Sequence, residues 1–313
     1  MEWLVRQVKD EVLKVSGCVE GAMPFRYLGI PINPSKLSKK ECQIMADNIL
    51  DKIRCFGTRK LSYGGRLSLV NFVLTGLYSY WANIFLIPNG VLRKIDAYCR
   101  NYLWDGSSDY SRAHMVKWEW VCSPKREGGL GVKYSLDWNV AAIGKLVWWI
   151  YTKPDSLWVK RVNQICIKGV DWASYQPKTH MGWNLKTICK VKDLMQPSYS
   201  MGQWTANPKG YRIHEGYHWI RTKQQPIGWY KLVWHSRCLP KHRFLIWLIM
   251  RNALNVKDKL FRHGICLDDL CCLCGTASET GVHLFHQCVY SQGLVAGMAS
   301  FIHIPVPSAN AII

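Results

Sequence analysis

Apolar positions recur with the helical period in the first third of the chain. Ser38 precedes a run in which isoleucines repeat near that period, and Glu41 follows it by three residues, the spacing of a helix-capping box. A second apolar face predicts a helix over residues 65–85, which Pro88 ends, and a third helix is predicted over 92–104. We expect the aromatic residues of these helices to pack between them as core.

The middle of the chain has a weaker pattern. It is rich in Gly, Pro, Trp and Lys, and it predicts one convincing apolar helix, near residues 136–151. The Gly-Gly-Leu-Gly run at 128–131 lacks the Lys-Ser/Thr ending of a phosphate-binding P-loop and the spacing of a dinucleotide fingerprint. We therefore expect a turn there, within an irregular Trp- and Gly-rich connecting region.

Two further helices are predicted near the C-terminus, over residues 241–250 and 256–263, just before a cysteine-rich segment. The whole pattern predicts a mainly α protein. Its expected parts are a helical first region, the connecting region, a small helical domain and a tail, at residues 1–104, 105–227, 228–290 and 291–313.

The net charge points to the kind of partner. The chain carries 41 Lys and Arg against 21 Asp and Glu, a formal charge of +20. Such an excess favours a polyanion, and RNA or DNA is the first candidate; an inert basic surface is the alternative. A membrane surface is less favoured, because no basic helix with one clean apolar face stands out. The expected phosphate contacts, which could also be a solvated helix face, are Lys241, Arg243, Arg251, Lys257 and Arg262.

The termini and cysteines bear on location. The first residues are charged from position 2 and lack the apolar stretch of a secretory signal, and the longest apolar helix is interrupted by Lys145 and shorter than the ~20 residues that a membrane span needs. We expect an intracellular protein of the nucleus or cytoplasm that is not secreted. In a reducing compartment its thirteen cysteines should be free or bound to metal.

Four side chains near the C-terminus have the spacing of a zinc site. Cys271 and Cys274 are separated by two residues, and His283 and Cys288 by four. Thiolates with an imidazole form a ligand set that selects zinc, and four protein ligands make a closed, structural site with no position for an activated water. Buried free thiols beside a packed histidine are the alternative explanation.

The neighbours of these four residues affect the assignment. Gly275 follows the second cysteine directly, where a tight turn needs an unrestricted φ. Cys272 and His286 are spare candidates that could replace Cys271 and His283 as ligands. The choice among them stays open at the level of sequence.

The C-terminal residues resemble a known family. The matching positions include Trp229, Trp234, Pro240-Lys241, Phe244, Trp247, Leu254, Leu260, Gly264, Glu279 and His283-Leu284-Phe285, together with the cysteines. This pattern resembles the zinc-binding domain of plant non-LTR (LINE-type) retrotransposon reverse transcriptases. Earlier stretches resemble the part that follows the polymerase palm in that family, at Phe25 to Pro31, Leu61 to Leu67, Tyr80-Trp81, Phe85 to Pro88, Trp118, Pro124-Lys125, the glycine run at 128–131 and Asn139.

The resemblance implies a thumb-like, template-handling role for residues 1–104, and RNA-directed DNA polymerase as the parent activity. That activity needs carboxylates around two metal ions, which the family places in an aromatic-Ala-Asp-Asp motif. The motif is absent here, and we interpret the adjacent pair Asp268-Asp269 as a polar surface turn. We therefore expect a non-catalytic C-terminal fragment whose palm lies upstream.

Some positions depart from the family pattern. Phe56 stands where the family usually has Trp, and after Cys288 the expected Ser-then-Trp ending becomes Ser291 followed by Gly293. Two alternatives to a nucleic-acid-binding fragment therefore remain. One is a domesticated protein-interaction module stapled by zinc, with unknown protein partners; the other is a relic without selected function.

Overall fold

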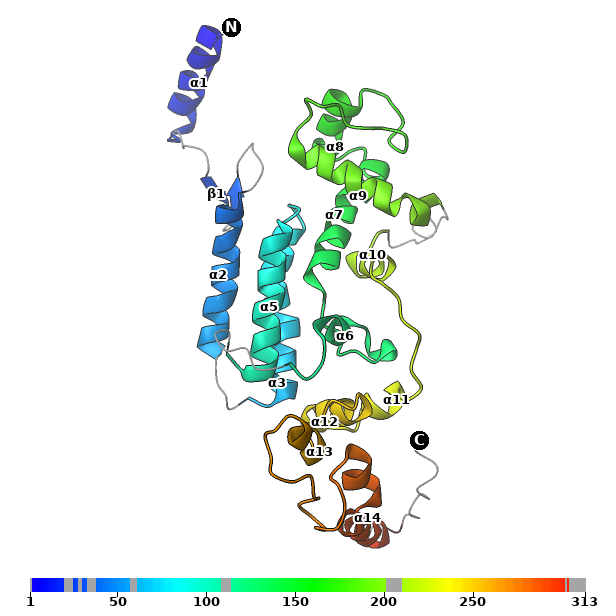
Figure 1. Cartoon of the computed structure of the whole chain (residues 1–313). Helices are drawn as coiled ribbons and strands as arrows, with labels where there is room; N and C mark the ends of the chain where they lie inside the picture. The colour runs from blue at the N-terminus through cyan, green and yellow to red at the C-terminus, as the bar shows by residue number, and fades with distance from the viewer. Residues whose placement is uncertain are drawn as a thin grey trace. The chain divides into compact units, whose positions relative to one another are not determined.

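The protein is described by a computed structural model, which covers residues 2–19, 25–27, 30–32, 38–56, 61–107, 114–200, 210–301 and 303. It is mainly α, as predicted (Figure 1). The α-helices are α1 (Glu2–Ser16), α2 (Lys39–Phe56), α3 (Tyr63–Leu69), α4 (Thr75–Ala82), α5 (Asn89–Asp105), α6 (Trp118–Cys122), α7 (Ser135–Thr152), α8 (Leu157–Val162), α9 (Trp183–Ser200), α10 (Ile213–Ile220), α11 (Tyr230–Val233), α12 (Pro240–Met250), α13 (Lys257–Arg262) and α14 (Val289–Phe301).

Shorter elements connect these helices. Strands β1 (Phe25–Tyr27) and β2 (Ile30–Ile32) form an antiparallel pair in which Phe25 lies opposite Ile32. The others are the π-helical turns η1 (Val70–Leu74), η3 (Asn163–Ile167) and η4 (His283–Gln287), and the 3-10 turn η2 (Lys125–Glu127). In the described part of the chain, no helix is both long and apolar enough to cross a membrane.

The chain packs as two compact units, each built from three separate segments. The first unit consists of residues 1–56, 72–99 and 133–223, and the second of 57–71, 100–132 and 224–313. This division reflects which residues pack together, whereas the domain boundaries expected from the sequence follow the order of patterns along the chain. The domain boundaries drawn from the sequence therefore remain a prediction.

The capping box at the start of α2 is confirmed. The backbone N–H of Ser38 donates to Glu41 Oε2 at 2.7 Å, and the N–H of Glu41 donates to Ser38 Oγ at 3.1 Å. Two backbone donors that a helix start leaves without partners are thereby satisfied. The helix then buries one face, which includes Ile49 and Ile53.

The helix predicted over 65–85 is interrupted by a π turn. It begins at α3, where Ser62 Oγ accepts a hydrogen bond from Gly65 N at 3.3 Å, and the turn η1 then separates α3 from α4. A π turn holds one more residue than an α turn, so it shifts the buried face by one position. Val70, the first residue of the π turn, is buried, and so is Tyr78 on α4 after it. A single α-helical face through all these positions was therefore a wrong prediction.

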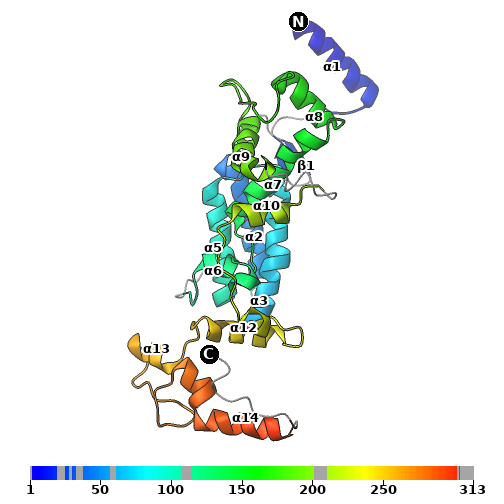
Figure 2. The ribbon, with the colours of Figure 1, turned by 90° about the vertical axis from the view of Figure 1, so that its right-hand side faces the viewer.

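The middle of the chain contains more helix than the one we predicted. Helix α7 lies close to the predicted 136–151, and α8, α9 and α10 were not anticipated. In the first unit, α7 packs against α9 and α10, which lie beside it in both views (Figures 1 and 2). Their shared core includes Ile143, Val147, Ile188 and Met195.

A buried lysine explains why α9 escaped prediction. Lys192 occupies a core position and only 3% of it is exposed. Its Nζ donates to the carbonyl oxygens of Trp172, Ala173 and Tyr175, at 3.1, 3.0 and 2.6 Å. Because buried cations are tolerated only when they are hydrogen-bonded, this lysine replaces an apolar residue at a point where the pattern needed one.

Asn139 fixes the segment that follows α4. Its Nδ2 donates to the carbonyl oxygens of Ala82 and Phe85, at 3.0 and 2.8 Å, and its Oδ1 accepts a hydrogen bond from Ile87 N at 2.8 Å. The asparagine is fully buried on α7. It therefore holds residues 83–87 against α7 in one conformation.

Candidate metal centre

A tight turn carries the first two cysteines. The N–H of Gly275 donates to Cys271 O at 2.8 Å, and the N–H of Cys271 donates to Ala277 O at 2.8 Å. Gly275 has a φ of 68°, which a residue without Cβ adopts at no steric cost. The turn expected after Cys274 is therefore present, and it points two sulfurs to the same side.

The π turn η4 carries the other two side chains. Residues five positions apart are rotated by about 140° in an α-helix, whereas a π turn brings them nearly into line. The N–H of Cys288 donates to His283 O at 2.7 Å, the bond that closes this turn. His283 N in turn donates to Thr280 Oγ1 at 3.0 Å. His283 and Cys288 consequently face the cysteine turn together.

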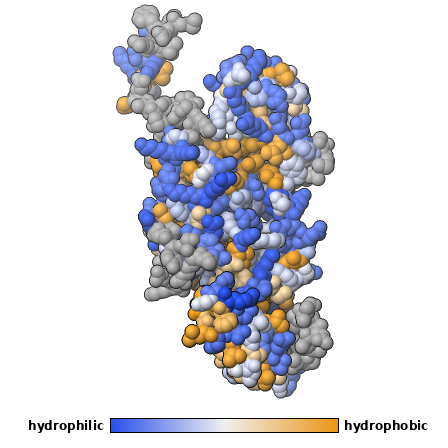
Figure 3. All heavy atoms as spheres, in the orientation of Figure 1, coloured by the Kyte–Doolittle hydropathy of each residue, from blue (hydrophilic) through white to orange (hydrophobic). Residues whose placement is uncertain are grey.

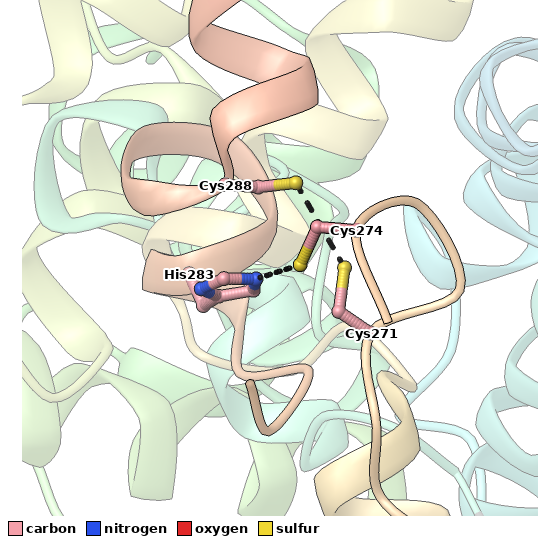
Figure 4. Close-up of side chains that lie close together, drawn as sticks. All are labelled: Cys271, Cys274, His283 and Cys288. Carbon is pink, nitrogen blue, oxygen red and sulfur yellow. Dashed lines mark hydrogen bonds between the residues drawn. The ribbon is translucent and has the colours of Figure 1, made fainter. Parts of the chain in front are cut away.

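The structure brings the four side chains into one cluster (Figure 4). Their ligand atoms all lie within 4.8 Å of one another. The sulfurs of Cys271 and Cys288 are 4.0 Å apart, and the sulfur of Cys274 is 3.3 Å from His283 Nε2. A tetrahedral ion with zinc–sulfur bonds of about 2.3 Å would separate its sulfur ligands by about 3.8 Å, so the donor set and its spacing fit zinc.

Local hydrogen bonds favour the thiolate form of Cys274. The hydroxyl of Thr276 donates to its sulfur at 3.3 Å. Hydrogen bonds from the hydroxyl and backbone N–H of Thr276, with a further one from His283, lower the pKa of Cys274 to about 6. Since the thiolate is the metal-binding form of cysteine, this side chain is prepared for coordination before an ion arrives.

Glu279 connects two backbone segments next to the cluster. It is buried, and its carboxylate accepts hydrogen bonds from the backbone N–H groups of Lys257 and Cys272, both at 3.1 Å. Burial alone would raise the pKa of Glu279, but the hydrogen bonds from Cys272 and the Lys257 backbone lower it below its usual value. One carboxylate thus joins the start of α13 to the cysteine turn. In the sequence, Glu279 is only one of the residues that carry the family resemblance, and no local pattern indicates this structural role.

The two spare ligand candidates lie outside the cluster. Cys272 and His286 are both exposed, and neither belongs to the group of four atoms that could hold a metal in the described residues. Asp268, of the adjacent aspartate pair, is exposed and accepts hydrogen bonds from Lys257 Nζ and Leu270 N, both at 3.0 Å. The pair therefore lies at the surface, but it precedes the β-bridge between Leu270 and Ser278 and does not form the turn expected from the sequence.

The five basic residues expected to contact phosphate have different surroundings. Lys241 is exposed. Lys257 forms an ion pair with Asp268 at 3.0 Å, and Arg262 one with Asp258 at 2.7 Å. Each pair has one exposed member and one half-buried member, and partly solvated pairs of this kind are weak enough to be exchanged for phosphate contacts. Arg243 donates to Ser236 O at 2.8 Å.

Arg251 is held in place by backbone carbonyl oxygens. Its guanidinium donates to the carbonyl oxygens of Glu127 and Gly128, and it lies 4.4 Å from the ring centroid of Trp120. Trp247 Nε1 also donates to Gly128 O, at 2.8 Å. The glycine run at 128–131 is indeed a turn, with Gly128 at a φ of 79°, and it serves as an acceptor for α12. This geometry argues against a phosphate contact by Arg251.

A comparison with known protein families matches this part of the chain. Residues 211–294, which contain all four clustered side chains, match a family model described as zinc-binding in reverse transcriptase. Over 129 residues the chain is 31% identical to a putative ribonuclease H protein of Arabidopsis thaliana. That match covers 41% of this chain and 21% of the relative, so the chain spans about a fifth of the relative's length. No solved structure matches the chain.

Proposed function

We propose that the protein is a zinc-stabilised, non-catalytic part of a plant LINE-type retrotransposon reverse transcriptase, and that it binds RNA or DNA through its basic surface. The observation that carries this proposal is the convergence of three sulfurs and one imidazole nitrogen inside a segment that resembles a reverse-transcriptase zinc-binding domain. The similarity to a putative ribonuclease H protein of Arabidopsis supports a nucleic-acid setting.

The proposed metal is zinc, held by Cys271, Cys274, His283 and Cys288. When bound, the ion supplies a structural cross-link and no reactive water, because the chain fills all four tetrahedral positions. The clustered residues then act as a scaffold that fixes η4 against the cysteine turn. The family match covers the zinc-binding part and no polymerase palm, which is compatible with a role that is not catalytic.

The proposal that the protein binds RNA or DNA is based on its positive charge. Residues 201–263 contain twelve Lys or Arg against Glu215 and Asp258. Lys241, Lys257 and Arg262 are our proposed phosphate contacts, with Arg243 beside them. Phosphate neutralisation by lysine and arginine releases counterions, so the affinity must fall steeply as salt rises.

The test combines metal analysis with RNA binding. Purified protein should contain close to one zinc per chain, and its affinity for a labelled RNA should drop strongly between about 50 and 200 mM salt. Charge reversal at Lys241 and Arg262 should weaken binding, whereas reversal at Lys9, on α1, serves as a matched control. Absent or salt-insensitive binding would remove the nucleic-acid half, and primer extension by this chain alone would contradict the non-catalytic half.

One observation favours the alternative of a protein-interaction module. Helix α14 contains no charged residue, and it leaves Val289, Met298 and Phe301 largely exposed. Exposed apolar patches often mark protein contacts. A pull-down that survives nuclease treatment, from a protein that binds neither RNA nor DNA, would favour this function over the proposed one.

A further inference from the structure

The first unit contains a groove that the metal centre does not use. It encloses about 560 Å³ and lies between α7, α8, the start of α9 and the segment after α4. Its walls include the aromatic rings of Phe85, Trp149 and Trp158. Figure 3 shows hydrophobic residues gathered over α7 and α9 in this unit. The volume falls within the range of ligand sites in proteins.

A few polar side chains line this otherwise apolar groove. Lys145 lines it, together with the amides of Asn83 and Asn184. Asn83 Nδ2 donates to Ser79 O at 2.8 Å, whereas its buried Oδ1 has no hydrogen-bond partner among the described residues. A buried acceptor without a partner is uncommon, and a ligand donor at the wall would satisfy it after a small rotation of the amide.

Positive charge lies in the wall of the groove and in the segments that form it. Lys145 and Lys153 place their Nζ atoms 4.8 and 5.0 Å from the ring centroid of Trp149. Residues 145–190, which form most of the walls, carry eight Lys or Arg against Asp155 and Asp171. A neutral apolar ligand would leave this charge uncompensated, so the partner should combine flat rings with negative charge.

We propose that this groove binds a base of single-stranded RNA or DNA, with its ring against Trp158 and its flanking phosphates near Lys145 and Lys153. Trp158 is 38% exposed, so one part of its ring is free to stack. Every base has a stacking face, and amides such as Asn184 can pair with base edges. A base inside a duplex cannot enter the groove, which makes the site selective for single strands. This inference rests on the nucleic-acid half of the proposed function and adds a second site to it.

The test measures binding of a labelled 12-nucleotide oligouridylate to the full chain. Trp158→Ala should weaken binding about fivefold or more, since base stacking is lost. Lys145→Gln should reduce the slope of log affinity against log salt by about one, because one phosphate contact disappears. Phe72→Ala and Lys94→Gln are matched controls: Phe72 is 82% exposed away from the groove, and Lys94 lies 5.8 Å from the ring of Tyr98.

The outcomes separate this site from the proposed function. If the wild type binds and Trp158→Ala, folded by circular dichroism, binds equally well, the groove site is wrong and the function stands. If the wild type binds neither RNA nor DNA, both the groove site and the nucleic-acid half of the proposed function are wrong. Ultraviolet cross-links of an iodouridine probe within 145–188 would support the groove, whereas cross-links confined to 228–290 would overturn it. Binding of an acidic apolar peptide that is lost in Trp158→Ala, in a protein whose groove gives no cross-link to the probe, would overturn the proposal and assign the groove to a protein partner. A deoxyuridylate competitor shows whether RNA or DNA is preferred.

Discussion

Two regions of the molecule are stabilised in different ways. The helices α7 and α9 share a buried apolar core, in which even a cation is fully hydrogen-bonded. In residues 256–288, by contrast, the buried side chains are Val256, Glu279 and three members of the Cys/His cluster. Most large apolar side chains in that segment are exposed, Leu267 completely so, and Leu260 and Leu284 are half-buried. One region is held by burial, and the other has almost nothing to bury except its proposed metal ligands.

The difference explains why a closed metal site belongs in the second region. A segment of about thirty residues cannot exclude enough apolar surface to offset its conformational entropy. Structural zinc contributes about 10 kcal/mol or more in small domains, which is enough to compensate. We therefore expect the two regions to respond oppositely to chelators and to core substitutions.

Removal of a ligand should produce the largest effect. Cys288→Ser leaves three donors, so zinc should be lost and residues 257–288 should exchange their amide hydrogens as an unfolded chain does, while α7 and α9 keep their protection. Metal analysis with hydrogen exchange measures both. Cys272→Ser is the control, because that exposed side chain lies outside the cluster. Retention of zinc by Cys288→Ser, or loss in Cys272→Ser, would refute our ligand set.

The second effect should be confined to the helical core. Lys192→Met leaves two buried carbonyl groups and one half-buried one without their donor, which should destabilise the first unit by about 3 kcal/mol. Denaturant unfolding followed at the first unit measures this loss, and the zinc content should not change. Lys190→Met, on the exposed side of the same helix, should cost less than about 0.5 kcal/mol. Equal losses in the two variants would show that the carbonyl contacts contribute little.

A smaller effect is expected beneath the metal centre. Glu279→Gln retains one acceptor oxygen, so either Lys257 N or Cys272 N loses its partner. Substitution of a group that orients metal ligands typically weakens metal affinity by about tenfold or more. We therefore expect about tenfold weaker zinc binding in a competition titration. Asp268→Asn removes the ion pair to Lys257 and keeps an oxygen that can accept from Leu270 N, so it should leave the affinity within about twofold. A normal affinity in Glu279→Gln would mean that the turn holds its shape unaided.

The smallest effect concerns a helix end. Ser38→Ala removes the side-chain acceptor of Glu41 N and should destabilise the first unit by about 1 kcal/mol, again without loss of zinc. Glu41→Gln preserves the reciprocal bond and should lose less. Thermal unfolding of the two variants distinguishes these cases, and a larger loss in Glu41→Gln would contradict the capping geometry.

Much of the molecule could be predicted where a local rule applies. The capping box at Ser38 and the length of α7 depend on neighbouring residues alone, as does the tight turn at Gly275. Other features depend on distant partners. No local pattern indicates that three carbonyls will surround Lys192, or that a π turn at Val70 will shift a helical face.

The metal centre shows the same limit. The spacing of the cysteines and histidine indicates which side chains to examine, and the structure brings them together. The support from Glu279 involves the backbone of Lys257 and Cys272, which lie 22 and 7 positions earlier in the chain. Arg251 cannot be told from a surface arginine until its acceptors are known. Both roles are set by tertiary contacts more than a few residues away in sequence, which periodicity does not record.

The contact between α12 and the glycine turn bears on how much of the chain is needed for the metal centre to fold unaided. Trp247 and Arg251 find their acceptors at Glu127 and Gly128, more than a hundred residues earlier. Excision of the family-matched stretch, residues 211–294, would leave an indole N–H and a guanidinium with no acceptor. An autonomous zinc module should therefore have to retain residues 100–132, so sequence homology marks a shorter stretch than the piece that can be transplanted.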